Sequence, residues 1–185
     1  AKIWLNTQTW SVISGMGDPE KRVEAMDSVA RYLDTDLGVC KIWPAMENYP
    51  SKEDPLTYYN KGCGENGSVF CHANTWAIIA ECMLGRADRA YKYYKQLLPM
   101  EAQKRAGEER YRAEPYVYSS NIFGPESNRF GLANVSWLTG TAAWMYLAVT
   151  QYLLGVRPTF EGLEVKPCLP GEMLPAQVTR RFRGK

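Results

Sequence analysis

The sequence has very little histidine and no closely paired cysteines. Among its 185 residues there is one histidine, and the five cysteines, Cys40, Cys63, Cys71, Cys82 and Cys168, include no Cys-x-x-Cys pair. Structural zinc sites combine closely spaced cysteines and histidines, so we expect no metal site. An odd number of widely spaced cysteines is typical of reduced thiols, and we therefore expect a cytoplasmic protein.

The sequence also lacks a strong net charge and a long apolar run. The formal net charge is +2, whereas a protein that binds nucleic acid needs a concentrated basic face. We interpret the basic residues 180–185 as a solvated terminus. No apolar stretch approaches the roughly 20 residues that cross a membrane, and nothing at the start has the pattern of a signal peptide. We expect neither nucleic acid nor a membrane as a partner.

Aromatic residues, in contrast, are abundant. The chain has six tryptophans and twelve tyrosines. Aromatic faces stack on the C–H surfaces of sugar rings, although they also fill protein cores. The composition is compatible with a sugar ligand and does not establish one.

Residues 62–76 contain the histidine and organise the rest of the chain. Three glycines fall within residues 62–67, which excludes a regular helix and predicts a loop over 62–68. From about Cys71, apolar residues recur every three or four positions until Gly85, which predicts a helix.

This pattern places His72 in the first turn of the predicted helix and Glu65 in the loop before it. The free N–H groups of a helix start favour an anion. We interpret the stretch as a candidate site for a polar ligand. A lone histidine with a structural or surface role is the other interpretation.

A second candidate lies at residues 136–141, Ser-Trp-Leu-Thr-Gly-Thr. Gly140 stands between two threonines, Thr139 and Thr141, just before an apolar helix. Hydroxyls and unpaired N–H groups together form a small cradle for an anion. An ordinary threonine cap with a close-packed glycine is the other interpretation.

Gln8 is a third candidate, because it lies in the largely apolar segment 2–15. A buried glutamine needs hydrogen-bond partners. A ligand hydroxyl or a structural partner would satisfy it equally well.

The remaining periodicity is mainly helical. Asp18 followed by Pro19 has the chemistry of a helix start, and the apolar stripe that follows, which includes Val23 and Met26, predicts a helix to about Leu33. We expect a further helix over 87–98, with Tyr91, Tyr94, Leu97 and Leu98 on the packing edge. We also expect an exposed helix over 101–112 and a helix over 142–154 that is buried on most sides. Residues 2–15 predict a short strand followed by a helix, and 123–134 predict a long loop.

Beyond Gly155 the period changes. Leu163 and Val165 alternate with charged residues, which predicts a half-buried strand. Paired helices joined by loops, followed by a β element, favour an α-helical toroid over a sandwich or a doubly wound sheet.

Five motifs in this chain resemble those of the cellobiose and chitobiose phosphorylases, glycoside hydrolase family 94. They are Asn-Thr-Gln-Thr-Trp at 6–10, Gly-Glu-Asn-Gly-Ser-Val-Phe-Cys-His at 64–72, Glu-Pro-Tyr-Val-Tyr at 114–118, Trp-Leu-Thr-Gly-Thr at 137–141 and Gly-Val-Arg-Pro-Thr-Phe-Glu-Gly-Leu at 155–163. The motifs follow the family's order and span nearly the whole chain.

The resemblance implies a fold and a domain division. It implies a mainly α structure, in which residues 1–155 are the second half of an (α/α)6 barrel, the C-terminal part of a catalytic domain. Residues 156–185 would begin a C-terminal β element that is jelly-roll-like. The chain starts at Ala1 without a methionine, and we interpret it as a fragment.

The resemblance also implies an activity and the residues that serve it. Family members cleave a β-linked disaccharide with inorganic phosphate as co-substrate and no cofactor, inverting the anomeric centre. His72, Thr139 and Gly140 would bind phosphate. Glu65 and Tyr59 would bind the acceptor sugar, and we place Gln8 and Ser120 with the substrate-binding residues.

The sequence departs from the family at several points. The general acid, an aspartate in an Asp-Trp-Asn-Asp motif, would lie upstream of residue 1, so no catalytic residue is assigned and we expect the isolated chain to be inactive. Gly64 stands where cellobiose phosphorylases tend to have lysine, and Ser119-Ser120 where a glutamine often follows. Both departures lie near sugar subsites and leave the acceptor open. Tyr59 favours a glucosyl acceptor over an N-acetylated one.

Several alternatives stay open. The alternatives to a cellobiose-like phosphorylase are part of an N,N'-diacetylchitobiose phosphorylase, an inverting hydrolase, a cyclic β-1,2-glucan synthase-like domain and a noncatalytic helical carbohydrate-binding fragment. As partners we expect a disaccharide and phosphate, and a homodimer for the full-length protein.

Overall fold

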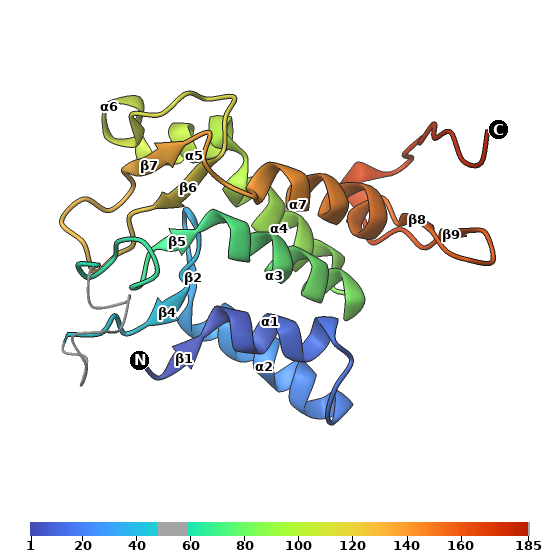
Figure 1. Cartoon of the computed structure of the whole chain (residues 1–185), viewed down its shortest axis with the longest axis horizontal. Coiled ribbons are helices and arrows are strands. Elements are labelled where there is room, and N and C mark those ends of the chain that lie inside the picture. Colours follow the sequence, from blue (N-terminus) through green and yellow to red (C-terminus); the bar gives the residue numbers. More distant parts are fainter. Residues whose placement is uncertain (48–58, 185) are drawn as a thin grey trace.

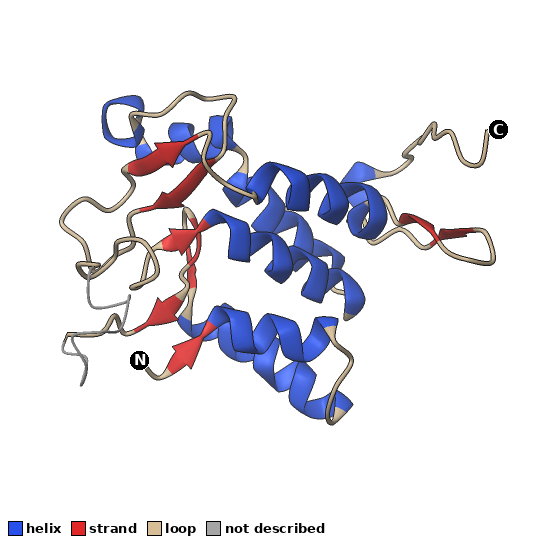
Figure 2. Cartoon of the chain, viewed as in Figure 1, coloured by secondary structure: helices blue, strands red, loops and turns tan. Residues whose placement is uncertain are grey.

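The computed structural model describes residues 1–47 and 59–184. The chain is mainly α, as the sequence predicts; the short strands between residues 3 and 136 lie at one end of the helices, and the hairpin of residues 156–165 lies at the other end (Figure 2). Among the described residues, no helix combines the length and the apolar character needed to cross a membrane.

Two helices begin the chain and pack side by side (Figure 1). The strand β1 (Ile3–Trp4) leads directly into α1 (Leu5–Ile13), and α2 (Pro19–Tyr32) follows a turn. The predicted cap is confirmed, because the Asp18 carboxylate accepts a 2.8 Å hydrogen bond from the Glu20 N–H. Met26 is fully buried, whereas Val23 is 38% exposed, so the predicted apolar stripe is narrower than expected.

The central helix is α3 (Cys71–Met83), which contacts α1, α4 and α7. Its start and end agree with the prediction from the glycine loop and Gly85. Ten of its thirteen residues are buried, because neighbouring helices cover it on several sides. Near its end the buried Glu81 lies 3.5 Å from both Arg86 and Arg89, and these arginines also reach Asp27 on α2. These ion pairs connect α2, α3 and the start of α4.

The helix α4 (Ala87–Leu97) forms as predicted, and its packing edge is predicted in part. Leu97 is buried as expected, whereas Tyr91, Tyr94 and Leu98 are only half-buried, and the two tyrosines stack on each other. Ala90 and Tyr93 are buried in place of Tyr91 and Tyr94, so the prediction is wrong for those two tyrosines.

Two short helices follow, α5 (Pro99–Ala106) and α6 (Glu108–Tyr111). The sequence predicts a single exposed helix here. Gly107, with a φ of +87°, separates the two, and Ala102 and Tyr111 are buried in the core.

A helical segment from Thr141 to Leu153 closes the helical part of the chain. It consists of α7 (Thr141–Leu147) and a π-helical turn, η2 (Ala148–Leu153). We expected it to be buried on most sides, and this is wrong: Met145 and Ala148 are buried, but Tyr146 is 67% exposed. Within the described residues the segment is covered by α3, and η2 is also in contact with α4 and with residues 156–158.

A three-stranded antiparallel sheet lies where α3 begins. The strands β5 (Val69–Phe70), β6 (Ser119–Ile122) and β7 (Ala133–Ser136) pair in that order, with Phe70 opposite Asn121. The predicted loop over 123–134 lies between β6 and β7. Two small two-stranded sheets lie at the same end, β1 with β4 (Ile42–Trp43) and β2 (Asp34–Thr35) with β3 (Gly38–Val39).

The chain ends in a β-hairpin and an extended segment. The strands β8 (Val156–Pro158) and β9 (Leu163–Val165) pair antiparallel, and a 3-10 turn, η3 (Gly171–Met173), follows. The strand at 163–165 is confirmed, but Val165 is 66% exposed, so it is not half-buried on this side as predicted. The barrel and the division at residue 155 stay predictions.

One apolar core connects these elements. It contains residues from each of the helices α1 to α7 and also reaches the strands; its largest fully buried members include Leu5, Met26, Leu33, Ile78, Ile79, Tyr93, Leu97, Tyr111 and Ile122.

Candidate functional site

The site begins with His72, which lies in the first turn of α3 as predicted. Its imidazole ring packs beside two tryptophans, with ring centroids 4.9 Å from Trp76 and 6.0 Å from Trp144, and the two tryptophan rings are 5.8 Å from each other. His72 is half-buried, and its Nε2 atom is fully buried without a hydrogen-bond partner among the described residues. Because buried polar atoms in native proteins are normally hydrogen-bonded, His72 Nε2 is a candidate atom for contact with a ligand.

Gly140 lies directly against this imidazole. A Cβ atom placed on Gly140 would be 3.0 Å from His72 Cε1 and 3.2 Å from Nδ1. Any side chain at residue 140 would therefore press on the histidine ring. The structure brings together two of the three residues predicted to bind phosphate, although they are 68 positions apart in the sequence.

Thr139, the third of these residues, is held in place by its neighbour. The hydroxyls of Thr139 and Thr141 are 2.6 Å apart, and the Thr141 N–H donates to Thr139 Oγ1 at 3.2 Å. Thr141 is fully buried and Thr139 is half-buried. The turn is thus an ordered threonine cap, the alternative interpretation of the sequence, and it also adjoins the histidine.

The electrostatic surroundings favour the neutral form of His72 when no anion is present. Burial is the main cause that lowers the pKa of His72 from its ordinary value, and the positive charge of Lys41 adds to it. An anion at the ring would act in the opposite direction, because an opposite charge stabilises the protonated imidazole.

Glu65 occupies the loop before α3 and forms an ion pair with Lys41. The side chain of Glu65 is 34% exposed, whereas that of Lys41 is only 10% exposed. The Lys41 ammonium also lies over the Phe70 ring, 4.4 Å from its centroid. Sequence reasoning missed Lys41. The signal that could have identified it is a single lysine between the apolar residues Cys40 and Ile42.

Tyr59 lies at the edge of the same loop and is 41% exposed. Its ring occupies the space in which a side chain at Gly64 would lie, and Gly64 has a φ of +52°. Its carbonyl accepts a 3.0 Å hydrogen bond from the Asn66 side chain. With the Tyr59 ring in this position, residue 64 cannot be a lysine. The ammonium group beside Glu65 is that of Lys41.

The two other predicted substrate-binding residues lie on separate elements. Ser120 lies on β6, and its hydroxyl donates to the Asn121 side chain at 3.1 Å and the Asn134 carbonyl at 3.3 Å. Its hydrogen bonds are therefore made within the sheet. Gln8 is half-buried on α1, and its backbone carbonyl accepts a 2.7 Å hydrogen bond from the Ser11 hydroxyl.

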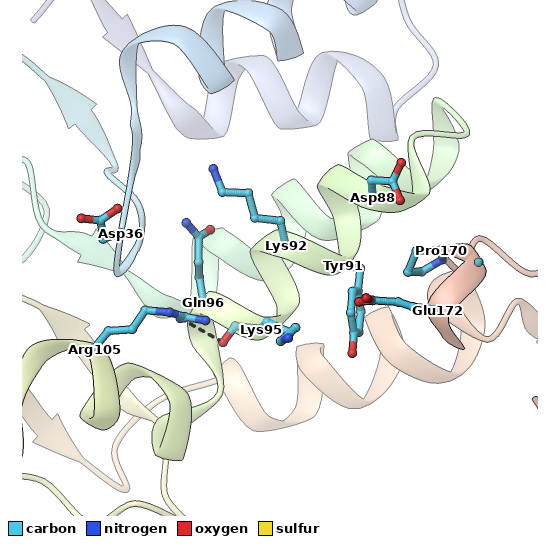
Figure 3. A pocket seen from close by; sticks show the side chains of 10 residues that line it. Asp36, Asp88, Tyr91, Lys92, Lys95, Gln96, Arg105, Pro170 and Glu172 are labelled. Carbon is cyan, nitrogen blue, oxygen red and sulfur yellow. Dashed lines mark hydrogen bonds between the residues drawn. The ribbon is translucent and has the colours of Figure 1, made fainter. Parts of the chain in front are cut away.

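An open cleft of about 780 Å³ lies on another face, between α4, α5 and the C-terminal segment (Figure 3). Lys92, Lys95 and Arg105 line it together with acidic residues, and the Arg105 guanidinium donates to the Lys95 carbonyl at 3.3 Å. None of the predicted site residues lines this cleft.

The candidate site contains a half-buried imidazole against a Thr-Gly-Thr turn and an ion-paired carboxylate on the adjoining loop. These groups are suited to an oxyanion and a polar ligand, and the protein that carries them is mainly helical. Comparison with known proteins identifies the family. The family description "Glycosyl hydrolase 94 superfamily, catalytic domain" matches residues 1–155.

The chain is also similar to several curated proteins. It is 35% identical over 182 residues to a solabiose phosphorylase of Paenibacillus borealis and 40% identical over 183 residues to an N,N'-diacetylchitobiose phosphorylase of Vibrio proteolyticus. These alignments cover 98% and 99% of this chain but only 23% of each relative. It is 36% identical over 170 residues, 89% of this chain and 6% of the relative, to the cyclic beta-(1,2)-glucan synthase NdvB of Rhizobium meliloti (strain 1021).

The chain belongs to the glycosyl hydrolase 94 superfamily, and it matches the catalytic domain of that family over most of its length. It spans less than a quarter of the phosphorylases it resembles.

Proposed function

We propose that this chain is part of an inverting disaccharide phosphorylase, a glycosyltransferase-type enzyme. The enzyme cleaves a β-linked glucosyl, cellobiose-like disaccharide with inorganic phosphate and releases an α-sugar 1-phosphate. The observation that carries the proposal is the close approach of Gly140 to His72, which joins two distant motifs at an imidazole whose Nε2 atom has no hydrogen-bond partner in residues 1–47 and 59–184.

In this mechanism His72 and the turn at Thr139 bind the phosphate that attacks the anomeric carbon. An inverting glycosidase needs a base to activate water. Phosphate is already an anion, so the protein needs only to position it and offset its charge. Protonation of His72 would do both, since a charge-assisted hydrogen bond is stronger than a neutral one.

The leaving sugar requires a proton from a carboxylic acid on the opposite side of the glycosidic bond. We assign that acid to an aspartate upstream of residue 1, and we expect the 185-residue chain alone to be inactive. Glu65 would accept hydrogen bonds from the acceptor sugar, and Tyr59, beside it, would line the same subsite. Gln8 and Ser120 complete the proposed sugar contacts.

The second candidate is an N,N'-diacetylchitobiose phosphorylase. The 40% identity to a protein of that name favours it. The bulk of Tyr59 beside Gly64 favours the unsubstituted glucosyl acceptor instead.

The test is phosphate-dependent turnover by the complete protein that carries this chain. With cellobiose and phosphate, we expect glucose and α-glucose 1-phosphate, and neither product when phosphate is omitted. Release of reducing sugar without phosphate would instead indicate an inverting hydrolase. Turnover of N,N'-diacetylchitobiose with no turnover of cellobiose would select the second candidate, and no turnover of any disaccharide would indicate a noncatalytic domain.

A further inference from the structure

Lys41 is a buried charge that the proposed mechanism has not used. It lies between β3 and β4, where its N–H donates to the Ser68 carbonyl and its carbonyl accepts from the Leu5 N–H, both at 2.8 Å. Its backbone therefore joins the glycine-rich loop to the start of α1. Figure 1 places β4 and β5 at the same end of the molecule, where α1 and α3 begin.

The ammonium group of Lys41 has two partners in this position. One is the carboxylate of Glu65, and the other is the face of Phe70, 4.4 Å from the ring centroid. A buried ammonium is unfavourable unless it is paired, so these partners fix where the lysine lies. Phe70 precedes α3 by one residue, which places the ammonium between the loop and the helix that carries His72.

Glu65, in contrast, keeps part of its surface accessible. Its side chain is 34% exposed, and its Oε2 atom is the one paired with Lys41. An ionised carboxylate accepts several hydrogen bonds through its two oxygens. The loop contains glycines on both sides of Glu65, at 64 and 67, and such a backbone does not hold a side chain in one orientation by itself.

We propose that Lys41 is a positioning residue for sugar recognition: its buried ammonium holds the Glu65 carboxylate in the orientation that accepts hydroxyl groups of a neutral acceptor sugar. The proposal rests on the proposed function, because Glu65 is the acceptor contact in that function. A carboxylated acceptor is disfavoured, since it would approach an exposed carboxylate whose positive partner is already engaged.

The test uses the complete protein and separates binding of sugar from binding of phosphate. The variants are K41M, which keeps the length of the side chain and removes its charge, and K41R, which keeps the charge. The matched control is K61M, because Lys61 pairs with Glu47 nearby but is 37% exposed. Synthesis is measured with α-glucose 1-phosphate as donor and glucose or glucuronate as acceptor.

For K41M we expect the KM for glucose to rise at least tenfold, while the KM for phosphate in the reverse direction changes less than twofold. K41R should recover most of the loss, K61M should match the wild type, and glucuronate should be a poor acceptor for the wild type. Unchanged KM for glucose in K41M, or equal losses for glucose and phosphate, would overturn the proposal.

A double-mutant cycle covers the case in which K41M folds poorly. If Lys41 acts through Glu65, the loss in E65Q and the loss in K41M/E65Q should be equal within twofold, whereas multiplying effects would overturn the proposal. Calorimetric binding of glucose gives a readout that needs no turnover. If the wild type binds glucose but shows no phosphorolysis, the proposed function fails while tenfold weaker binding by K41M still supports Lys41. No binding of glucose by the wild type would overturn both.

Discussion

At the scale of single residues, His72 and Thr139 are the proposed contacts to the phosphate oxyanion. Replacing Thr139 by valine keeps the shape of the side chain and removes its hydroxyl. We expect phosphate affinity to fall about 10-fold to 100-fold, because a hydrogen bond to a charged group contributes about 1.5–3 kcal/mol. The measurement is calorimetric titration of the complete protein with phosphate.

The control for this prediction is Thr150→Val. The Thr150 hydroxyl donates to the Tyr146 carbonyl at 2.7 Å, within the helical segment that Thr139 precedes. This variant also removes a hydroxyl, but at a position that we do not propose as a contact of His72 or phosphate. If T150V weakens phosphate binding as much as T139V does, the effect comes from the helix and Thr139 is not a ligand.

The pH dependence of His72 gives a second prediction at this scale. Burial, followed by the charge of Lys41, lowers the pKa of His72 in the folded protein. The lowered pKa contributes stability that is present above the unfolded pKa of about 6.5 and is lost as the pH falls through the folded value. Phosphate bound at the ring should raise the pKa of His72.

The measurement is an NMR titration of the His72 imidazole with and without phosphate, in which the variant His72→Gln identifies the signal. We expect a pKa below 6.5 without phosphate and a higher value with it. If phosphate binds to the protein and the pKa of His72 does not change, His72 is not part of the anion site.

The role of a single residue could be predicted from the sequence where its partners lie close to it along the chain. Local patterns predicted an anion preference for His72 and for the Thr-Gly-Thr turn, and the structure places Gly140 of that turn against His72. Lys41 did not follow, because its partner Glu65 lies 24 residues away and no local spacing connects them. The sequence also did not connect Tyr59, an expected acceptor contact, with Gly64, a departure from the family, although the ring of Tyr59 fills the space beside Gly64.

At the scale of elements, the helix boundaries were predicted better than the helix faces. The starts of α2 and α3 depend on residues next to them, Asp18-Pro19 and the glycine loop, and these agree with the structure. The buried face of α4 depends on the position of α3, which sequence periodicity does not specify, and so Tyr93 rather than Tyr91 is in the core.

The cap of α2 gives a prediction at this scale. The Asp18 carboxylate satisfies the Glu20 N–H at 2.8 Å, and replacing an N-cap aspartate by alanine costs about 1 kcal/mol of stability. We expect D18A to lower the free energy of unfolding by that amount in a denaturant titration, and D18N to lower it by less. The exposed Asp36 supplies the control, D36A, for which we expect a change within about 0.5 kcal/mol. Equal effects of D18A and D36A would show that the cap contributes nothing.

At the scale of the whole molecule, family membership and mainly helical structure are established, and the closed barrel is a prediction. The helical segment from Thr141 to Leu153 is covered by α3 on one side and exposes Tyr146 on another, with Trp137 and Leu138 exposed just before it. Sequence composition alone predicted burial there, because it assumes that every apolar face has a neighbour. The relatives are about four times longer than this chain, and that proportion agrees with a face completed by further structure.

The central claim is that two distant segments bind one phosphate ion, and a double-mutant cycle of phosphate affinity tests it most directly. Calorimetry on the complete protein would compare the wild type, H72A, T139V and the double variant. If both residues contact the same ion, each single variant loses affinity and the losses fail to add, with a coupling of about 0.5–3 kcal/mol. Unchanged affinity in H72A, or losses in the two single variants that add in full, would contradict the account.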